Sequence, residues 1–118
     1  MNWLVAGLAC CAASVLAGAF GAHGLSARLD PRGVELWETA ARYLMYGGLG
    51  VALVGFASRV LGLPLTAAGA CLLSGSFIFS GTVFALALGS PRWLGAVTPV
   101  GGVLMVVGFL LFAVATWR

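Results

Sequence analysis

The sequence contains few charged residues. It contains no lysine, six arginines, three acids and one histidine, and charged residues make up 8% of its 118 positions. A water-soluble domain carries about a quarter charged residues. Hydrophobic residues make up 62% and the mean hydropathy is +1.11, which leaves too little polar surface to cover a soluble globule. The composition therefore excludes a soluble domain and predicts that lipid is the solvent for much of the chain.

The sequence also lacks a cluster of cations and a cluster of metal-ligating residues. The arginines are spread along the chain rather than grouped on one polar face, which argues against nucleic-acid binding despite a pI of about 9.1. Cys10, Cys11 and Cys71 lie in apolar runs without a CxxC pair, and His23 is the only histidine. We therefore predict no metal site and no cofactor, and we interpret the cysteines as small packing residues.

The apolar segments also lack the residues that enzymes and coupled transporters use. All three acids, Asp30, Glu35 and Glu38, fall in one short polar stretch, whereas proton-coupled carriers place an acid within the membrane. No Ser/His/acid set and no phosphate-binding glycine loop is readable. We therefore predict a protein without enzymatic activity. Four hydroxyls of the third apolar segment are expected to form hydrogen bonds between helices: Ser74, Ser76, Ser80 and Thr82.

Long apolar stretches fill most of the sequence. Four stretches of near-bilayer length predict four membrane-spanning helices in a single domain, residues 1–118: about 2–22, 40–57, 64–88 and 94–117. The fourth helix has two candidate starts, Leu94 and Pro99, and Thr98 precedes the second. The first stretch has no basic leader and is expected to be a retained span. The predicted fold class is all-α, an integral membrane four-helix bundle.

A charged hairpin, residues 23–39, separates the first two spans. Asp30 and Pro31 predict a helix start there, with the acid as N-cap and proline at the first helical position. Beyond that start, apolar and charged side chains recur at helical spacing on two different faces: Val34, Trp37, Ala41 and Leu44 on one, Glu35, Glu38 and Arg42 on the other. We therefore expect a short amphipathic helical segment at the membrane interface that continues into the second span.

Small residues recur at regular intervals within the spans. Helices in lipid associate where small side chains let their backbones approach closely. The candidate packing positions are Gly7, Ser14, Gly18 and Gly21 in the first span, Gly75 in the third, and Gly101 and Gly108 in the fourth. The spacing predicts helix interfaces but does not distinguish an interface inside the bundle from one between two copies of the chain.

Four sequence strings, taken in order and spacing, resemble one family of small inner-membrane proteins. They are GAFGAHGL from Gly18, WETAARY from Trp37 with Tyr46 after it, FSGTVFALAL from Phe79, and LGAVTPVGG from Leu94. The family is known as domain of unknown function 423 and includes the YgdD-like bacterial proteins and transmembrane protein 256. The resemblance covers nearly the whole chain, and it implies a four-helix membrane protein whose biochemical activity is unassigned.

One departure from that family bears on chemistry. Relatives usually carry a histidine after the tyrosine of the second span, whereas Tyr46 is followed here by Gly47. A polar glutamine is common in the family where this chain has Leu44. Any proposal in which two histidines cooperate as a metal pair or a proton relay therefore loses its second member in this chain.

These observations predict a small accessory or scaffold subunit. We expect it to pack on a larger membrane protein complex or on itself, with membrane lipid around it. The alternative is that His23, Glu35, Glu38 and Arg42 form a polar cluster at one mouth of the bundle and bind an anionic lipid headgroup or a small solute. The simpler interpretation of the same residues is that Glu38 pairs with Arg42 one turn later while Arg42 reaches the lipid headgroups.

The arginines also predict an orientation. Arg28, Arg32, Arg42 and Arg92 flank one side of the predicted bundle, and Arg59, Arg118 and the amino terminus flank the other. Counting cations alone favours a cytoplasmic hairpin. The resemblance favours cytoplasmic termini instead, because relatives carry their basic residues at the termini and second loop. We expect a bacterial inner (cytoplasmic) membrane protein with both termini on the cytoplasmic side.

Overall fold

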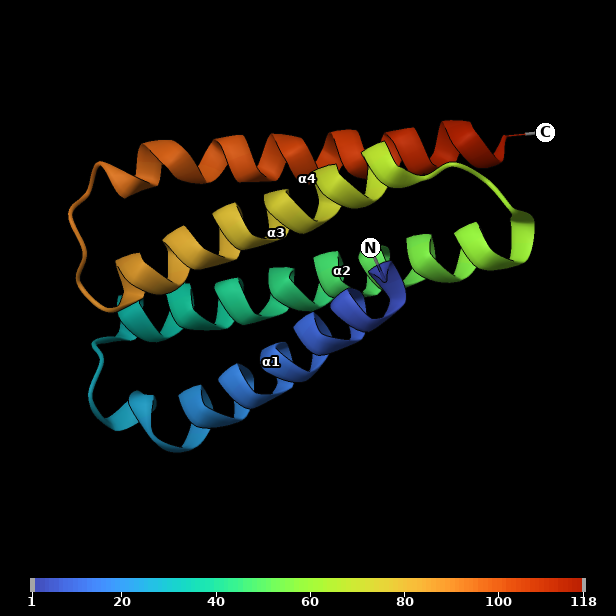
Figure 1. Ribbon diagram of the computed structural model, residues 1–118. Coiled ribbons are helices and arrows are strands. Elements are labelled where there is room, and N and C mark those ends of the chain that lie inside the picture. Colours follow the sequence, from blue (N-terminus) through green and yellow to red (C-terminus); the bar gives the residue numbers. More distant parts are fainter. Residues whose placement is uncertain (1, 118) are drawn as a thin grey trace.

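Four long helices account for most of the protein. The computed structural model describes residues 2–117, which contain no β-strand (Figure 1). The elements are α1 (Trp3–His23), the short 3-10 helix η1 (Leu25–Ala27), α2 (Pro31–Leu61), α3 (Thr66–Ala87) and α4 (Leu94–Thr116). All four long helices are long and apolar enough to cross a membrane. The predicted all-α, four-span fold is therefore confirmed.

Local signals in the sequence set the starts of the first two helices. The Asn2 side chain accepts a hydrogen bond from the Val5 backbone N–H at 3.2 Å, which caps α1. The Asp30 carboxylate accepts one from the Gly33 N–H at 2.7 Å, and Pro31 occupies the first position of α2. Each cap satisfies a backbone donor that has no partner inside its own helix. The predicted Asp30-Pro31 start is confirmed.

Helix α2 is much longer than the apolar stretch that predicted it. Its 31 residues extend for about 46 Å at the usual rise, whereas a hydrocarbon core is about 30 Å thick. The amphipathic segment is therefore not a separate element but the first turns of α2, which continue without a break past residue 40. The charged side chains of α2 therefore lie on the first turns of the same unbroken helix that is long and apolar enough to cross a membrane.

The turn between α3 and α4 is built around Gly89. Its φ of +96° belongs to the left-handed region that glycine adopts without strain. The Gly89 N–H donates to the Leu86 carbonyl at 3.1 Å and the Ser90 N–H donates to the Ala85 carbonyl at 3.0 Å. This is the bonding pattern of a Schellman motif, which ends α3 and reverses the chain direction.

Of the two starts considered for the fourth helix, the structure has Leu94, and a start at Pro99 is wrong. The N–H groups of Leu94, Gly95 and Ala96 each donate to the carbonyl three residues earlier, at 2.9–3.2 Å, so a tight turn has already formed before Pro99. Pro99 then lies inside α4. Its missing N–H removes only the bond to Gly95, close to the helix end, and this loss does not break the helix.

The four helices lie side by side in chain order, α1 to α4, in an up-and-down row (Figure 1). Each packs mainly on its sequence neighbours, and α1 and α4 form the two edges. The buried apolar core is centred on α2 and α3: Val51, Val54, Leu65, Ala68 and Leu72. Within the most apolar 18 residues of each helix, 44% are buried in α2 but only 17% in α4. The edge helices thus leave most of their apolar surface for lipid or for another protein.

Candidate functional site

The charged hairpin places the predicted polar residues at one end of the molecule but does not gather them. His23 is the last residue of α1, while Glu35, Glu38 and Arg42 lie on the first turns of α2. All four side chains are exposed. Between residues 2 and 117 no side-chain hydrogen bond joins any two of them. The Glu38–Arg42 pair and the four-residue cluster therefore stay predictions.

On these first turns of α2, the face opposite the charged residues is packed against the rest of the protein, as the spacing of its apolar residues predicted. Ala41 and Leu44 are buried, and Val34 and Trp37 are half-buried. The apolar face of α2 points toward α1 and α3 because the core lies on that side. The charged face consequently points outward, away from the core.

Trp37, at this end of the molecule, contacts two neighbouring helices. Its indole N–H donates to the Ala17 carbonyl of α1 at 2.7 Å. Its ring meets Phe84 of α3 edge to face, with the centroids 4.5 Å apart, and it lies against Gly21, where a Cβ would come within 2.5 Å of the ring. Trp37 therefore joins three helices. The sequence placed Trp37 on the apolar face of α2, but it gave no sign of which helices the indole would contact.

The small residues of α1 do not all serve the same interface. Gly7, Ser14 and Gly21 are buried against α2. A Cβ on Gly7 would lie 2.5 Å from the Gly48 carbonyl oxygen and 2.7 Å from the Ala52 Cα. The Ser14 hydroxyl donates to the Ala41 carbonyl at 2.5 Å.

A Cβ on Gly18, in contrast, would meet nothing within 4 Å. Gly18 therefore does not take part in helix packing within the chain.

The α3–α4 interface is built in the same way. Gly75, Gly101 and Gly108 are buried where the two backbones approach each other. A Cβ on Gly75 would lie 2.7 Å from the Met105 backbone nitrogen, and one on Gly101 would lie 2.9 Å from the Gly75 carbonyl oxygen. These distances leave no room for a larger side chain. Glycine at these positions lets the two helices pack closely in lipid.

The hydroxyls of α3 mostly do not bridge helices, so this expectation was wrong for Ser74 and Ser76. Each donates to a carbonyl four residues earlier in its own helix, Ser74 to Ala70 and Ser76 to Leu72, both at 2.6 Å. A hydroxyl one turn from a carbonyl reaches it locally, without needing a neighbouring helix. The Thr82 hydroxyl does bridge helices, since it lies 2.7 Å from the Thr98 hydroxyl of α4.

The sequence analysis also singled out Ser80, as a hydroxyl expected to bond between helices, and Gly47, as a departure from the family. The Ser80 hydroxyl is buried and has no hydrogen-bond partner within the described chain. A Cβ on Gly47 would collide with the Ser76 hydroxyl oxygen. A histidine at position 47 would therefore require α2 and α3 to separate or Ser76 to change. Within residues 2–117, no three His, Cys, Asp or Glu side chains lie close enough to hold a metal ion.

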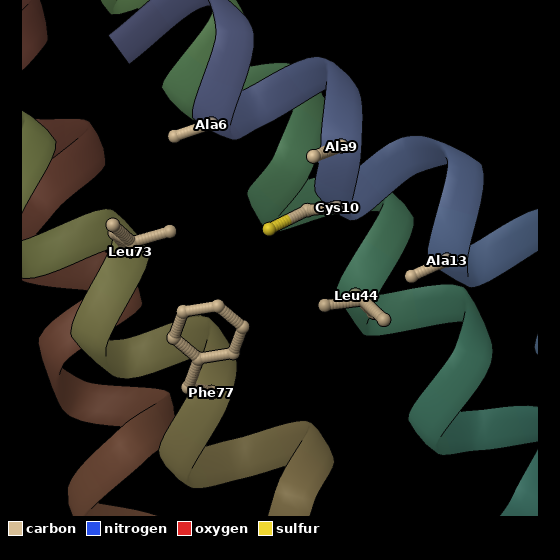
Figure 2. Close-up of a pocket in the computed structure, with 7 residues that line it drawn as sticks. All are labelled: Ala6, Ala9, Cys10, Ala13, Leu44, Leu73 and Phe77. Carbon is tan, nitrogen blue, oxygen red and sulfur yellow. The ribbon is translucent and has the colours of Figure 1, made fainter. Parts of the chain in front are cut away.

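An apolar groove opens between α1 and α3 on one face of the row. Its volume is about 280 Å³. It is lined by Ala6, Ala9, Cys10 and Ala13 of α1, Leu44 of α2, and Leu73 and Phe77 of α3 (Figure 2). The Cys10 sulfur and the Leu44, Leu73 and Phe77 side chains point into the space, and Leu44 lies between the walls. The groove offers packing surface for an apolar group.

Comparison with known proteins gives a consistent result. The family described as protein of unknown function (DUF423) matches residues 17–102. A UPF0382 membrane protein of Staphylococcus haemolyticus is 40% identical over 116 residues, covering 98% of this chain and 95% of its own. One from Staphylococcus epidermidis is 44% identical over 101 residues, covering 86% and 83%. The Bacillus subtilis protein YwdK is 37% identical over 100 residues, covering 83% and 81%. No solved structure matches the chain.

Proposed function

Since this chain belongs to the DUF423 family of membrane proteins, whose function is unknown, we propose that it is a non-enzymatic scaffold or accessory subunit. It would associate side by side in a bacterial cytoplasmic membrane with a second copy of itself or with a larger membrane protein. Both termini would face the cytoplasm in this arrangement. The observation that carries the proposal is the groove between α1 and α3.

The groove has the properties of a helix-docking surface. The wall from α1 is made of small side chains, Ala6, Ala9 and Ala13, at intervals of three and four residues along one face. Such a wall lets a second helix approach closely, and close approach rather than water exclusion drives association in lipid. Its volume of about 280 Å³ lies just below the range of about 300–1,000 Å³ that is usual for small-molecule sites. An apolar side chain from a neighbouring helix would suit it better than a drug-sized ligand.

Photo-crosslinking from the groove tests the proposal. A photoreactive amino acid at Ala9, on the α1 wall, is expected to give a discrete protein adduct when membranes are irradiated at native expression level. The matched control is the same amino acid at Val114 of α4, which is 73% exposed and does not line the groove. Adducts with this chain itself would identify a homo-oligomer, and adducts with one other membrane protein would identify an accessory subunit.

A second variant checks that the groove itself is responsible. Ala13→Phe fills the groove and is expected to remove most of the Ala9 adduct, whereas Val114→Phe is expected to leave it unchanged. The Ala13 side chain is exposed, so the larger ring does not invade the core. Protein adducts of equal yield from Ala9 and Val114, or lipid adducts alone at both positions, would contradict the proposal.

The alternative function remains a proposal of its own. In it, His23, Glu35, Glu38 and Arg42 bind an anionic lipid headgroup or a small solute at the mouth of the bundle. It predicts that Arg42→Ala lowers the amount of anionic lipid that co-purifies with the protein in a mild detergent, as lipid mass spectrometry would measure. Unchanged lipid content would count against this site. The exposure of all four side chains gives it less support than the groove gives to the scaffold role.

A further inference from the structure

The side of α2 that faces away from the groove carries a line of exposed residues. They follow one another at intervals of three or four residues, which places them on one face of the helix. We call this the outer face of α2, and it consists of Glu38, Arg42, Tyr46, Leu49, Leu53 and Phe56. Arg42 and Leu53 lie about 160–180° around the helix from Leu44, which lines the groove. The outer face and the groove are therefore on opposite sides of the helix row.

Contacts with α1 set the depth of Arg42. The Ser14 hydroxyl donates to the carbonyl of Ala41, so Ser14 and Arg42 lie at nearly the same level. Ser14 is close to the middle of α1, which runs from Trp3 to His23. The 21 residues of α1 extend for about 31 Å, which matches a hydrocarbon core of about 30 Å. With α1 across the membrane, Arg42 lies about halfway through the bilayer.

Contacts with α3 give a similar depth. A Cβ on Gly47 would collide with the Ser76 hydroxyl oxygen, so α2 and α3 lie against each other there. Ser76 is close to the middle of α3, which runs from Thr66 to Ala87. Arg42 precedes Gly47 by five residues, about 8 Å along the helix axis. Both neighbouring helices thus place Arg42 within about 8 Å of the bilayer middle.

A charged side chain at that depth is costly unless it has a partner of opposite charge or a route to water. Arg42 is exposed, and within residues 2–117 it forms no side-chain hydrogen bond. Glu38 lies one turn earlier on the same face and is also exposed. The outer face of α2 therefore presents a cation and an anion together at a depth where lipid tails solvate neither of them.

We propose that a second copy of the chain packs against the outer face of α2, with Glu38 of each copy paired with Arg42 of the other. Two copies inserted in the same orientation can be related by a two-fold axis along the membrane normal, which brings their α2 helices together in parallel. Glu38 and Arg42 are one helical turn apart, so each reaches its opposite charge across such an interface. The two ion pairs remove all four charges from contact with lipid.

The remainder of the outer face suits the same partner. Leu49, Leu53 and Phe56 continue the spacing of three and four residues by which parallel helices pack together. Tyr46 adds a hydroxyl that can form a hydrogen bond across the interface. A different membrane protein would have to supply an acid and a cation at matching heights. A second copy supplies both by symmetry, which is why we favour it.

Disulfide crosslinking in membranes at native expression level tests the interface. In a chain whose three cysteines are replaced by alanine, Leu49→Cys is expected to give a disulfide-linked dimer on mild oxidation, because equivalent positions face each other across the two-fold axis. The matched control is Leu16→Cys, which is 71% exposed on α1 and lies outside the outer face. A dimer yield from Leu49→Cys no greater than that from Leu16→Cys would overturn the proposal.

Reversed charges test the ion pairs themselves. In the Leu49→Cys chain, Arg42→Glu leaves only acids at the two positions, and Glu38→Arg leaves only cations. Each variant alone is expected to give about tenfold less dimer, because like charges would then face each other. When the two variants are produced together with different tags, mixed dimers are expected to return to the yield of the unreversed chain.

The mixed dimers distinguish pairing between copies from pairing within one chain. A Glu38–Arg42 pair confined to one chain would be broken in both variants and would not be restored by mixing them. Absence of mixed dimers while both variants accumulate in the membrane would therefore overturn the ion pairs. If the reversed variants do not accumulate, the comparison of Leu49→Cys with Leu16→Cys still decides whether the copies meet at this face.

The pairing rests on the scaffold function and names its partner, but it uses a different face from the groove. A Leu49→Cys dimer without an adduct from Ala9 would support the pairing and count against the groove. An adduct from Ala9 without a Leu49→Cys dimer would do the reverse. Lower anionic lipid content in Arg42→Ala, with no Leu49→Cys dimer, would overturn the pairing and assign Arg42 to lipid binding.

Discussion

Gly7→Ala is expected to destabilise the folded protein by about 3 kcal/mol, the upper end of the effect of overpacking. The new Cβ would lie 2.5 Å from the Gly48 carbonyl oxygen and 2.7 Å from the Ala52 Cα, and it would also collide with the Ala52 nitrogen. All three are backbone atoms, so no side-chain rotation relieves the collision. Helices α1 and α2 would have to move apart and lose the contacts that join them.

Gly18→Ala on the same helix is the matched control. Nothing lies within 4 Å of the position that its Cβ would take. Alanine is also the better helix former by about 1 kcal/mol, so this variant is expected to be neutral or slightly more stable. Unfolding by titration with sodium dodecyl sulfate in mixed micelles, followed by circular dichroism, measures both variants. Equal stability of Gly7→Ala and Gly18→Ala would show that α1 and α2 are not in close contact at Gly7.

Trp37→Ala is expected to have an effect of similar size, about 3 kcal/mol, which is the lower end for removing a large aromatic side chain. The substitution removes the edge-to-face contact with Phe84, the hydrogen bond to Ala17 and the ring that fills the space over Gly21. Because these contacts reach α1 and α3 at once, the loss should loosen the hairpin end of the whole row. Limited proteolysis within the hairpin is expected to become faster in this variant.

Two controls separate the parts of that effect. Trp37→Phe keeps most of the ring but loses the indole N–H, and is expected to cost only about 0.6–1 kcal/mol, the usual contribution of one hydrogen bond. Trp117→Ala removes a tryptophan that is 85% exposed, and is expected to change stability by less than about 0.5 kcal/mol. If Trp37→Ala and Trp117→Ala were equally stable, Trp37 would not be joining three helices.

Predictions that rest on neighbours in sequence agreed with the structure. The Asp30 cap and Pro31 start depend on atoms within one helical turn, so the sequence alone was enough to place them. The packed face of Trp37, Ala41 and Leu44 follows from helix periodicity in the same way. Each is decided by local geometry.

Predictions failed where the sequence offered two possible structures for the same residue, such as two helix starts or two hydrogen-bond acceptors. Pro99 is compatible with a helix start, but a tight turn that begins at Leu94 had already formed before it. Ser74 and Ser76 were expected to reach other helices, yet the carbonyl one turn back was the nearer acceptor. The sequence contains both possibilities in each case, and their relative energies depend on surroundings that it does not describe.

The sequence by itself determined the class of this protein, its four spans, its family and the faces of α2. These follow from composition, apolar length and helical period, all of which are properties of one segment at a time. Only the tertiary structure decided that Gly7 contacts α2 while Gly18 does not, and that Arg42 lies level with the middle of α1. Periodicity gives the direction of each face but not the helix that lies opposite it, because register and neighbour depend on the packing of all four helices together.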